Sequence, residues 1–141
     1  MYADYTFYKD KYHGGLDELE YKGLAEKSSA YLDYYTMGKA KYNKDLEALK
    51  MACCALSDKY KEIEELSSAY KKISSDAVSV GKKSETVGSY SVTYLSASEF
   101  KGEMATLNSE RAEIAKMYLA GTNLLYRGGC RDVCTSYCNR L

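Results

Sequence analysis

The sequence predicts a mainly α-helical fold: a small bundle of about three to four helices, one of them long and central, with one β-hairpin between the second and third main helices. Apolar residues recur every three or four positions over most of the chain, which is typical of amphipathic helices. The chain contains no proline, so its helices can run far without kinks. Between residues 82 and 94 the period changes to two, with Tyr90, Val92 and Tyr94 separated by small polar residues, which favours a half-exposed strand.

The hairpin has a plausible turn and register. Gly88-Ser89 supplies glycine at the first central position of a two-residue type II′ turn. The opposed pairs are then Val87–Tyr90, Glu85–Val92 and Lys83–Tyr94. Another register keeps Ser84–Tyr94 as one strand beside Val78–Val80. A lone hairpin is marginal in water, so it must lie on the helices as a covering ribbon or be completed by another chain as a presented loop.

The N-terminal third begins with an aromatic segment. Tyr5, Tyr8 and Tyr12 follow one another at spacings of three and four, which fits a short helix or a folded-back arm that ends at His13-Gly14-Gly15. A first main helix follows over 16–35, closed by Gly38 in a left-handed conformation. His13 is the only histidine, so we interpret it as a turn residue and exclude His-based metal sites and most Ser–His or Cys–His dyads.

The central helix has the clearest pattern. Asn43 or Asp45 can cap it. Its stripe extends over about 40 Å at 1.5 Å per residue. The stripe consists of Leu46, Leu49, Cys53, Leu56, Tyr60, Ile63, Leu66, Tyr70 and Ile73. Residues 51–55 are small and apolar all round, which predicts burial from two sides, with Cys53 and Cys54 as small core residues.

A third main helix is expected after the hairpin. Ser96 and Glu99 form a capping-box pattern at its start. Arg111 interrupts the apolar stripe near residues 108–110. We therefore expect a break or an irregular start, with the dependable helix covering Glu110–Ala120.

The five cysteines are an odd number in two clusters, which favours reduced thiols over a secreted disulfide framework. Cys130, Cys134 and Cys138 follow at intervals of four and would share one face of a helix. Three thiolates lack the fourth ligand of a structural zinc site. We interpret residues 130–141 as a tail that docks or frays, and we expect no metal and no cofactor.

Length, composition and charge restrict the classes of function that the chain can have. A chain of 141 residues is one domain, and its 20 basic and 20 acidic residues cancel, which gives no electrostatic footprint for a DNA backbone. No apolar run approaches the roughly 20 residues of a membrane span. The N-terminus lacks a basic and then apolar leader, so we expect no signal peptide and a protein made and kept in a cytoplasm.

The 16 tyrosines favour a self-associating or partner-binding surface, or else half-buried core edges; composition leaves both open. No phosphate-cradling loop, nucleophile elbow or second histidine is present, so we expect no enzymatic activity.

Several segments form an ordered pattern. They are the aromatic start ending in Tyr12-His13-Gly14-Gly15, then Ala30–Asp33 with Thr36, then Lys50–Leu56, Lys83–Tyr94 and Tyr118–Gly128. Taken together they resemble the small head–tail connector proteins (adaptor or head-completion proteins) of long-tailed bacteriophages and prophages. Two features depart from the pattern: Asn123 stands where a glycine is expected, and a cysteine-bearing tail follows Gly129. We divide the chain into a connector-like helical domain, 1–129, with its hairpin near 82–94, and the tail, 130–141.

The resemblance implies a helical bundle with one hairpin. It implies a structural role in the virion: a dodecameric ring beneath the portal that extends the DNA channel and docks the stopper or tail, with DNA passing through without sequence-specific binding. No cofactor or membrane is needed. A ring of identical subunits requires two different contact surfaces per chain, for which we consider the charged face of the central helix and the Tyr-rich N-terminal arm.

Two groups of contact residues are expected. The first lies on the hairpin and could act by strand addition or loop docking: Val87, Ser89, Tyr90, Val92 and Tyr94. The second follows from the resemblance, because C-terminal arms of this family reach toward the portal: Leu124, Leu125, Tyr126 and Arg127.

A rival interpretation is a cytoplasmic helical protein-binding module or regulator whose cysteine-rich tail binds a metal or responds to redox conditions. Stoichiometric zinc that is lost on Cys134→Ser would favour this rival. Another tail-completion protein of similar size is a further alternative, since helices with a hairpin recur in many proteins.

Overall fold

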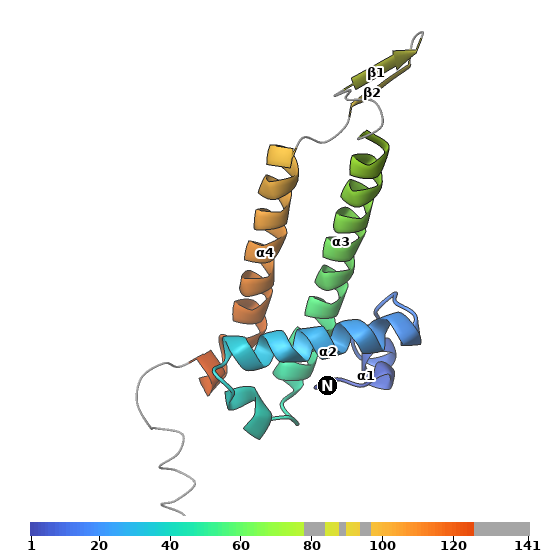
Figure 1. Ribbon diagram of the computed structural model, residues 1–141. Helices are drawn as coiled ribbons and strands as arrows, with labels where there is room; N and C mark the ends of the chain where they lie inside the picture. Colours follow the sequence, from blue (N-terminus) through green and yellow to red (C-terminus); the bar gives the residue numbers. More distant parts are fainter. Residues whose placement is uncertain (78–83, 88–89, 94–96, 126–141) are drawn as a thin grey trace, which may run out of the picture.

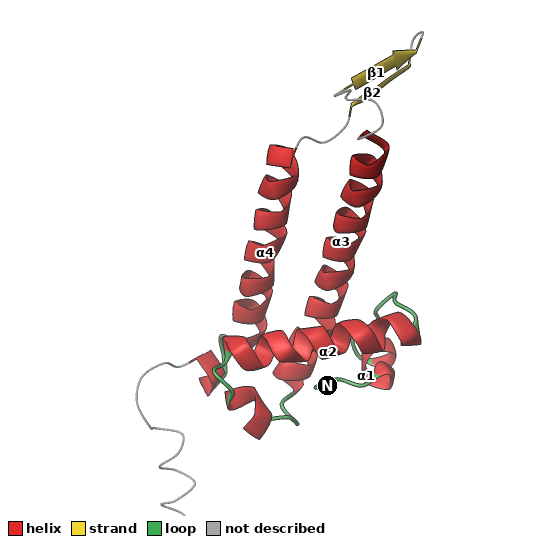
Figure 2. Ribbon diagram, in the orientation of Figure 1, coloured by secondary structure: helices red, strands yellow, loops and turns green. Residues whose placement is uncertain are grey.

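The structure, a computed structural model, describes residues 1–77, 84–87, 90–93 and 97–125 (Figure 1). The fold is mainly helical, as predicted (Figure 2). Two long helices, α3 (Glu47–Ala77) and α4 (Ala97–Leu119), lie side by side and antiparallel, and α2 (Glu18–Tyr35) crosses them at one end (Figure 1). Short helices complete this end of the molecule: α1 (Tyr5–Asp10) and the 3₁₀ helices η1 (Lys39–Tyr42) and η2 (Asn123–Leu125).

Local sequence signals explain the boundaries of the first helices. The Asp4 carboxylate accepts a hydrogen bond from the Phe7 amide at 2.9 Å and caps α1. His13 adopts a left-handed conformation with φ of 59°, so its predicted role as a turn residue is confirmed. Gly38 is left-handed at φ of 81°, as expected, and closes the turn after α2.

The predicted caps of α3 are wrong. The helix begins at Glu47, and the Asn43 side-chain amide instead donates to the Lys39 carbonyl at 3.0 Å, which closes η1. Leu46 stands before the first helical residue, and its carbonyl accepts from the Lys50 amide at 3.1 Å. Asn43 therefore stabilises the end of η1 instead of capping the start of α3.

The core lies where α2 crosses α3 and α4. Its largest fully buried side chains come from all of these segments: Tyr8, Tyr21, Leu32, Leu49, Leu56 and Leu119. Cys53 and Cys54 are fully buried, which confirms their prediction as core residues. Burial raises the pKa of the Cys54 thiol to about 12 and raises that of Cys53 as well. Both groups are therefore neutral thiols that serve packing.

The aromatic N-terminal segment folds back into this core. Tyr8 is fully buried, its ring centroid lies 4.2 Å from that of Tyr21, and its hydroxyl donates to the Asp58 carboxylate at 2.5 Å. Tyr2 is also buried, and its hydroxyl donates to Asp33. The suggestion that this arm supplies a ring contact is wrong for these tyrosines, because they already pack inside the subunit.

The charged face of α3 is also partly used within the chain. Lys61 pairs with Glu20 of α2 at 2.5 Å, and Lys59 pairs with Glu110 of α4 at 2.8 Å. Ion pairs at the protein surface contribute little to stability. These pairs connect α3 with α2 and with α4, and they leave less of this face for another subunit than the sequence suggested.

The predicted break near residues 108–110 is wrong, because α4 runs without interruption from Ala97 to Leu119. The Arg111 guanidinium lies between two aromatic rings, 5.1 Å from the centroid of Tyr31 and 5.0 Å from that of Tyr60. One of its nitrogens donates to the Tyr60 hydroxyl at 2.9 Å. A planar cation stacks well on aromatic faces, so arginine occupies an apolar stripe position without breaking the helix.

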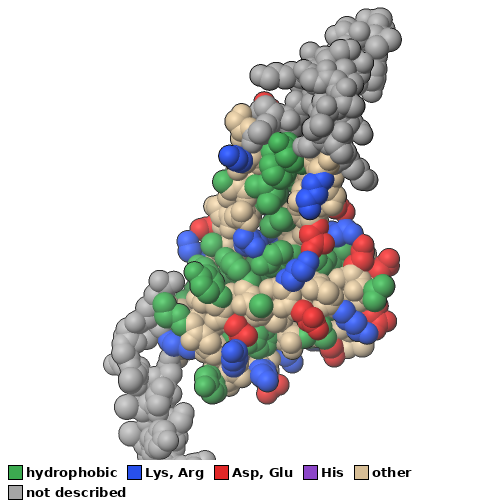
Figure 3. All heavy atoms as spheres, in the orientation of Figure 1, with side chains coloured by type: hydrophobic (Ala, Val, Ile, Leu, Met, Phe, Trp, Pro, Cys, Tyr) green, Lys and Arg blue, Asp and Glu red, His purple; other side chains and the backbone are tan. Residues whose placement is uncertain are grey.

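The far ends of α3 and α4 are joined by aromatic packing and carry the hairpin. Tyr70 and Phe100 stack with centroids 3.9 Å apart, and apolar side chains fill the seam between the two helices (Figure 3). Beyond them, β1 (Ser84–Val87) and β2 (Tyr90–Thr93) pair antiparallel, with Val87 opposite Tyr90 and Glu85 opposite Val92, as in the first of the two expected registers. The predicted turn at Gly88-Ser89, the pair Lys83–Tyr94 and the cap residue Ser96 lie outside the described residues.

Candidate interaction surfaces

The described residues contain no cluster of metal-ligating groups and no membrane-spanning candidate. Within them, no three His, Cys, Asp or Glu side chains gather closely enough to hold a metal ion. None of the described helices is sufficiently long and apolar to cross a bilayer.

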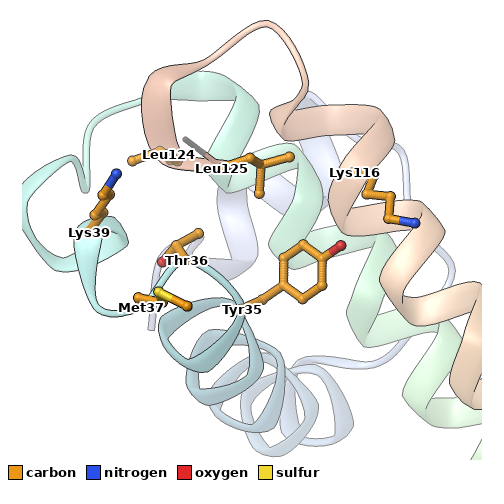
Figure 4. A pocket seen from close by; sticks show the side chains of 7 residues that line it. All are labelled: Tyr35, Thr36, Met37, Lys39, Lys116, Leu124 and Leu125. Carbon is orange, nitrogen blue, oxygen red and sulfur yellow. The ribbon is translucent and has the colours of Figure 1, made fainter. Parts of the chain in front are cut away.

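A hollowed apolar surface lies at the C-terminal end of α2, and we call it the α2 groove. It consists of two adjoining hollows of ≈ 280 and ≈ 610 Å³ that share Tyr35 and Met37 (Figure 4 shows the first). The lining of the two together comprises Tyr31, Asp33, Tyr34, Tyr35, Thr36, Met37, Lys39, Lys116, Leu124 and Leu125.

The end of α2 is built so that Met37 faces outward. Thr36 is buried, and its hydroxyl donates to the Leu32 carbonyl at 2.7 Å and accepts from the Ala40 amide at 3.2 Å. Met37 then adopts φ of 54° and Gly38 follows at 81°, so the chain reverses direction over two residues. The Met37 side chain is consequently 68 % exposed at the centre of the groove.

Tyrosines form the α2 wall of the groove. Tyr31 and Tyr35 stack with centroids 5.8 Å apart, and Tyr34 beside them is 81 % exposed. Burial raises the pKa of Tyr31, while the adjacent Arg111 charge opposes that change. The wall is thus a row of aromatic rings, with Tyr31 held against Arg111 and Tyr34 projecting into solvent.

The opposite wall comes from η2 and the end of α4. The Thr122 hydroxyl donates to the Leu119 carbonyl at 2.7 Å and accepts from the Leu124 amide at 3.3 Å, which turns the chain back toward α2. Leu125 is half-buried and lines the groove, whereas Leu124 is only 5 % exposed and belongs to the core. Leu124 is therefore not available as the surface contact that the sequence suggested, and Tyr126 and Arg127 lie outside the described residues.

Charged groups at the rim are few and paired. Asp33 accepts from the Tyr2 hydroxyl, and the Lys116 ammonium pairs with Glu113 at 2.8 Å, a hydrogen bond that raises the pKa of Lys116. The groove therefore favours apolar and aromatic contacts over the capture of a small ion.

Sequence reasoning missed the groove because it followed the buried stripe of each helix. The sequence offers a signal at Tyr34. In the helix expected over 16–35, residues 24, 28, 31 and 35 are spaced by three or four and mark the buried side. Tyr34 lies outside this series, at an exposed position that normally carries a polar residue. Met37 gave no signal, because its exposure depends on its left-handed backbone conformation.

The hairpin is the second candidate surface, at the other end of the molecule from the α2 groove (Figure 1). Among the described residues its sheet has two strands, so each strand has one neighbour and one open edge. Val87, Tyr90 and Val92 lie within these strands, whereas Ser89 and Tyr94 lie outside the described residues. Open edges are ready templates for pairing with another chain.

No protein-family model, no curated protein and no solved structure matches this chain.

Proposed function

We propose that this chain is a structural virion protein, a head–tail connector. In this proposal it forms a dodecameric ring below the portal, extends the DNA channel and docks the stopper or tail. It is made in the cytoplasm of the bacterial host and resides at the head–tail interface of the virion. The role is one of assembly and requires no catalysis and no cofactor.

The observation that carries the proposal is the hairpin at the tip of the α3–α4 pair, remote from the core (Figure 1). A two-stranded sheet of four-residue strands is marginal in water when nothing packs on it. For a hairpin at this distance from the core, we infer that a partner chain completes the sheet. A neighbouring subunit or a stopper protein in a ring is such a partner, and strand addition is the contact that the open edges favour.

Charge and surface composition support the same role. The equal numbers of acidic and basic residues suit a channel wall that DNA must pass without being held, since binding to phosphates depends on clustered cations. The two candidate surfaces lie at opposite ends of the subunit and differ in chemistry, one a strand edge and the other an apolar groove. Head-to-tail ring contacts require two unlike surfaces of this kind.

The register supplies a variant that tests the strand edge without disturbing the ladder. In a hairpin with a two-residue loop, the pair next to the loop, Val87–Tyr90, exchanges hydrogen bonds across the ladder, and pairs alternate from there. The next pair, Thr86–Ser91, therefore directs its amide groups to the outer edges. Ser91→Pro removes one outward amide of β2 and blocks strand addition at the β2 edge, and Ser91→Ala is the matched control that keeps this amide.

The experiment is electron microscopy of the purified protein over a concentration series, alone and with the portal protein of the same genome. We expect closed rings with a hole wide enough for duplex DNA, or a complex with the portal. Ser91→Pro should abolish this assembly and Ser91→Ala should retain it. Monomers at every concentration together with no portal binding would overturn the connector proposal. Assembly that survives Ser91→Pro would remove the β2 edge from the mechanism.

A further inference from the structure

The first hollow of the α2 groove is apolar and has a basic rim. Met37 and Leu125 line it, and Lys39 and Lys116 stand at its two sides (Figure 4). The described residues that line this hollow include no aspartate and no glutamate. Its volume of ≈ 280 Å³ is larger than the cavity of about 150 Å³ that holds a benzene molecule. The hollow therefore suits an aliphatic side chain that has acidic neighbours.

The first turn of α2 has the complementary character, and we call residues 17–20 the α2 start. All four of these residues are exposed, and the large apolar side chain of Leu19 is 86 % exposed. Asp17, Glu18 and Glu20 surround Leu19 in the sequence, and Figure 3 shows acidic side chains gathered where α2 begins. The α2 start is therefore an exposed leucine within an acidic surface.

The carboxylates of the α2 start are not committed to strong contacts within the subunit. The Asp17 side chain makes no capping hydrogen bond to its own helix. Glu18 and Glu20 each pair with one lysine at the surface, and surface pairs of this kind contribute little to stability. These acidic groups can therefore face a basic partner at low cost.

The α2 start and the α2 groove cannot meet within one molecule. The helix between them is continuous over 18 residues, which is about 27 Å at 1.5 Å per residue. It begins beside α1 and ends beside η2 (Figure 1). Each copy of the chain thus presents the acidic, leucine-bearing surface at one end of α2 and the basic-rimmed hollow at the other.

We propose that the α2 start of one copy docks into the α2 groove of a second copy. Leu19 occupies the first hollow against Met37 and Leu125, and its acidic neighbours face Lys39 and Lys116 of the second copy. Burial of apolar surface supplies the affinity, and the opposite charges orient the contact.

This contact is heterologous, so a pair of copies keeps one open groove and one open α2 start, to which further copies add head to tail. By itself it gives pairs and open chains. It involves no part of the hairpin and does not rest on the connector proposal.

Sedimentation velocity over a concentration series tests the contact. The full chain is used in the Ser91→Pro background, where the connector proposal expects no closed rings, so that association through α2 is measured alone. Leu19→Ser removes the aliphatic side chain and should raise the dissociation constant at least about ten-fold. Met37→Asp places a carboxylate opposite the acidic α2 start and should have an effect of similar size, and aspartate tolerates the left-handed backbone at this position.

The matched control is Met117→Ser. Met117 is also a helical apolar residue, 67 % exposed, and it lies outside both surfaces. Its replacement should change the dissociation constant by less than about two-fold. Circular dichroism checks that all three variants retain their helices, which we expect because the altered side chains are exposed.

A mixing experiment tests the head-to-tail geometry. Leu19→Ser keeps an intact groove, and Met37→Asp keeps an intact α2 start. An equimolar mixture of the two should therefore form 1:1 pairs with the affinity of the unaltered contact, although each variant alone is monomeric at the same concentration. These pairs should not grow, because the groove and the α2 start that remain open are the altered ones.

Three results would overturn the proposal. The first is a protein with unaltered α2 surfaces that stays monomeric up to about 1 mM, which is too weak for a specific contact. The second is an equal dissociation constant for Leu19→Ser, Met37→Asp and Met117→Ser. The third is a mixture that associates no better than its two components.

Discussion

Replacing Gly14 by alanine should be among the most destabilising single changes in the N-terminal segment. Gly14 follows α1, and its amide donates to the Tyr8 carbonyl at 3.0 Å, so the backbone passes directly over the Tyr8 ring. A Cβ atom at Gly14 would lie 1.9 Å from Cζ of Tyr8, whereas ordinary contacts between carbon atoms begin near 3.4 Å. The backbone or the ring must therefore move.

The magnitude follows from how tightly the Tyr8 ring is held. It is fully buried, stacks on Tyr21 with centroids 4.2 Å apart, and its hydroxyl donates to Asp58 at 2.5 Å. Overpacking costs about 1–3 kcal/mol, and a hydrogen bond to a charged group contributes about 1.5–3 kcal/mol. We expect Gly14→Ala to lower the free energy of unfolding by about 3–5 kcal/mol, a large part of the 5–15 kcal/mol typical of a domain.

The assay is urea unfolding followed by circular dichroism at equal protein concentration. The control is Gly15→Ala, where an added Cβ meets no atom within 4 Å; we expect a change within about 1 kcal/mol there. In a Tyr8→Leu background, which lacks the ring carbon that is struck, Gly14→Ala should cost much less. A Gly14→Ala protein as stable as Gly15→Ala would refute this account of the arm.

Three further predictions concern other parts of the subunit. Arg111→Lys should lower the free energy of unfolding by about 1–2 kcal/mol through lost stacking on Tyr31 and Tyr60. Lys116→Ala, at an exposed ion pair, should leave the melting temperature close to that of the wild type, so thermal unfolding distinguishes the two variants. Burial, reinforced by the hydrogen bond to Asp58, raises the pKa of Tyr8 from 10.0 to about 12. The contribution of the neutral Tyr8 hydroxyl to stability is therefore complete below pH 10 and falls as the pH rises toward 12. The melting temperature should drop over this pH window, and the drop should be less steep in Tyr8→Phe. Gly38→Ala should lower the free energy of unfolding by about 1 kcal/mol, because φ at this position is 81°. Met37→Gly removes a side chain from a left-handed backbone position and should leave the free energy of unfolding equal or higher. Urea midpoints that rank the two variants the other way would contradict the turn geometry.

Much of the helical architecture could be predicted from the sequence because helix periodicity is a local property. The stripe through Cys53 and Leu56 marks the buried side of α3 without knowledge of its neighbours, and both residues are buried. The end of α2 is likewise local, since glycine at position 38 readily adopts the left-handed conformation that closes the turn there. The alternation around Tyr90 and Val92 marks the strand segment for the same reason.

What the sequence left undecided depends on residues distant in the chain. Arg111 is an interruption in its own helix and becomes a stacking partner only when Tyr31 of α2 and Tyr60 of α3 stand on either side of it. Tyrosine composition allowed either a core or a surface, and tertiary packing decided each position separately: Tyr8 is buried against Tyr21, whereas Tyr34 is exposed. The wall that Leu124 and Leu125 give to the first hollow of the α2 groove exists only because η2 returns to α2 after α4. Local patterns therefore determined which segments are helical, and the meeting of distant segments decided which apolar side chains remain for a partner.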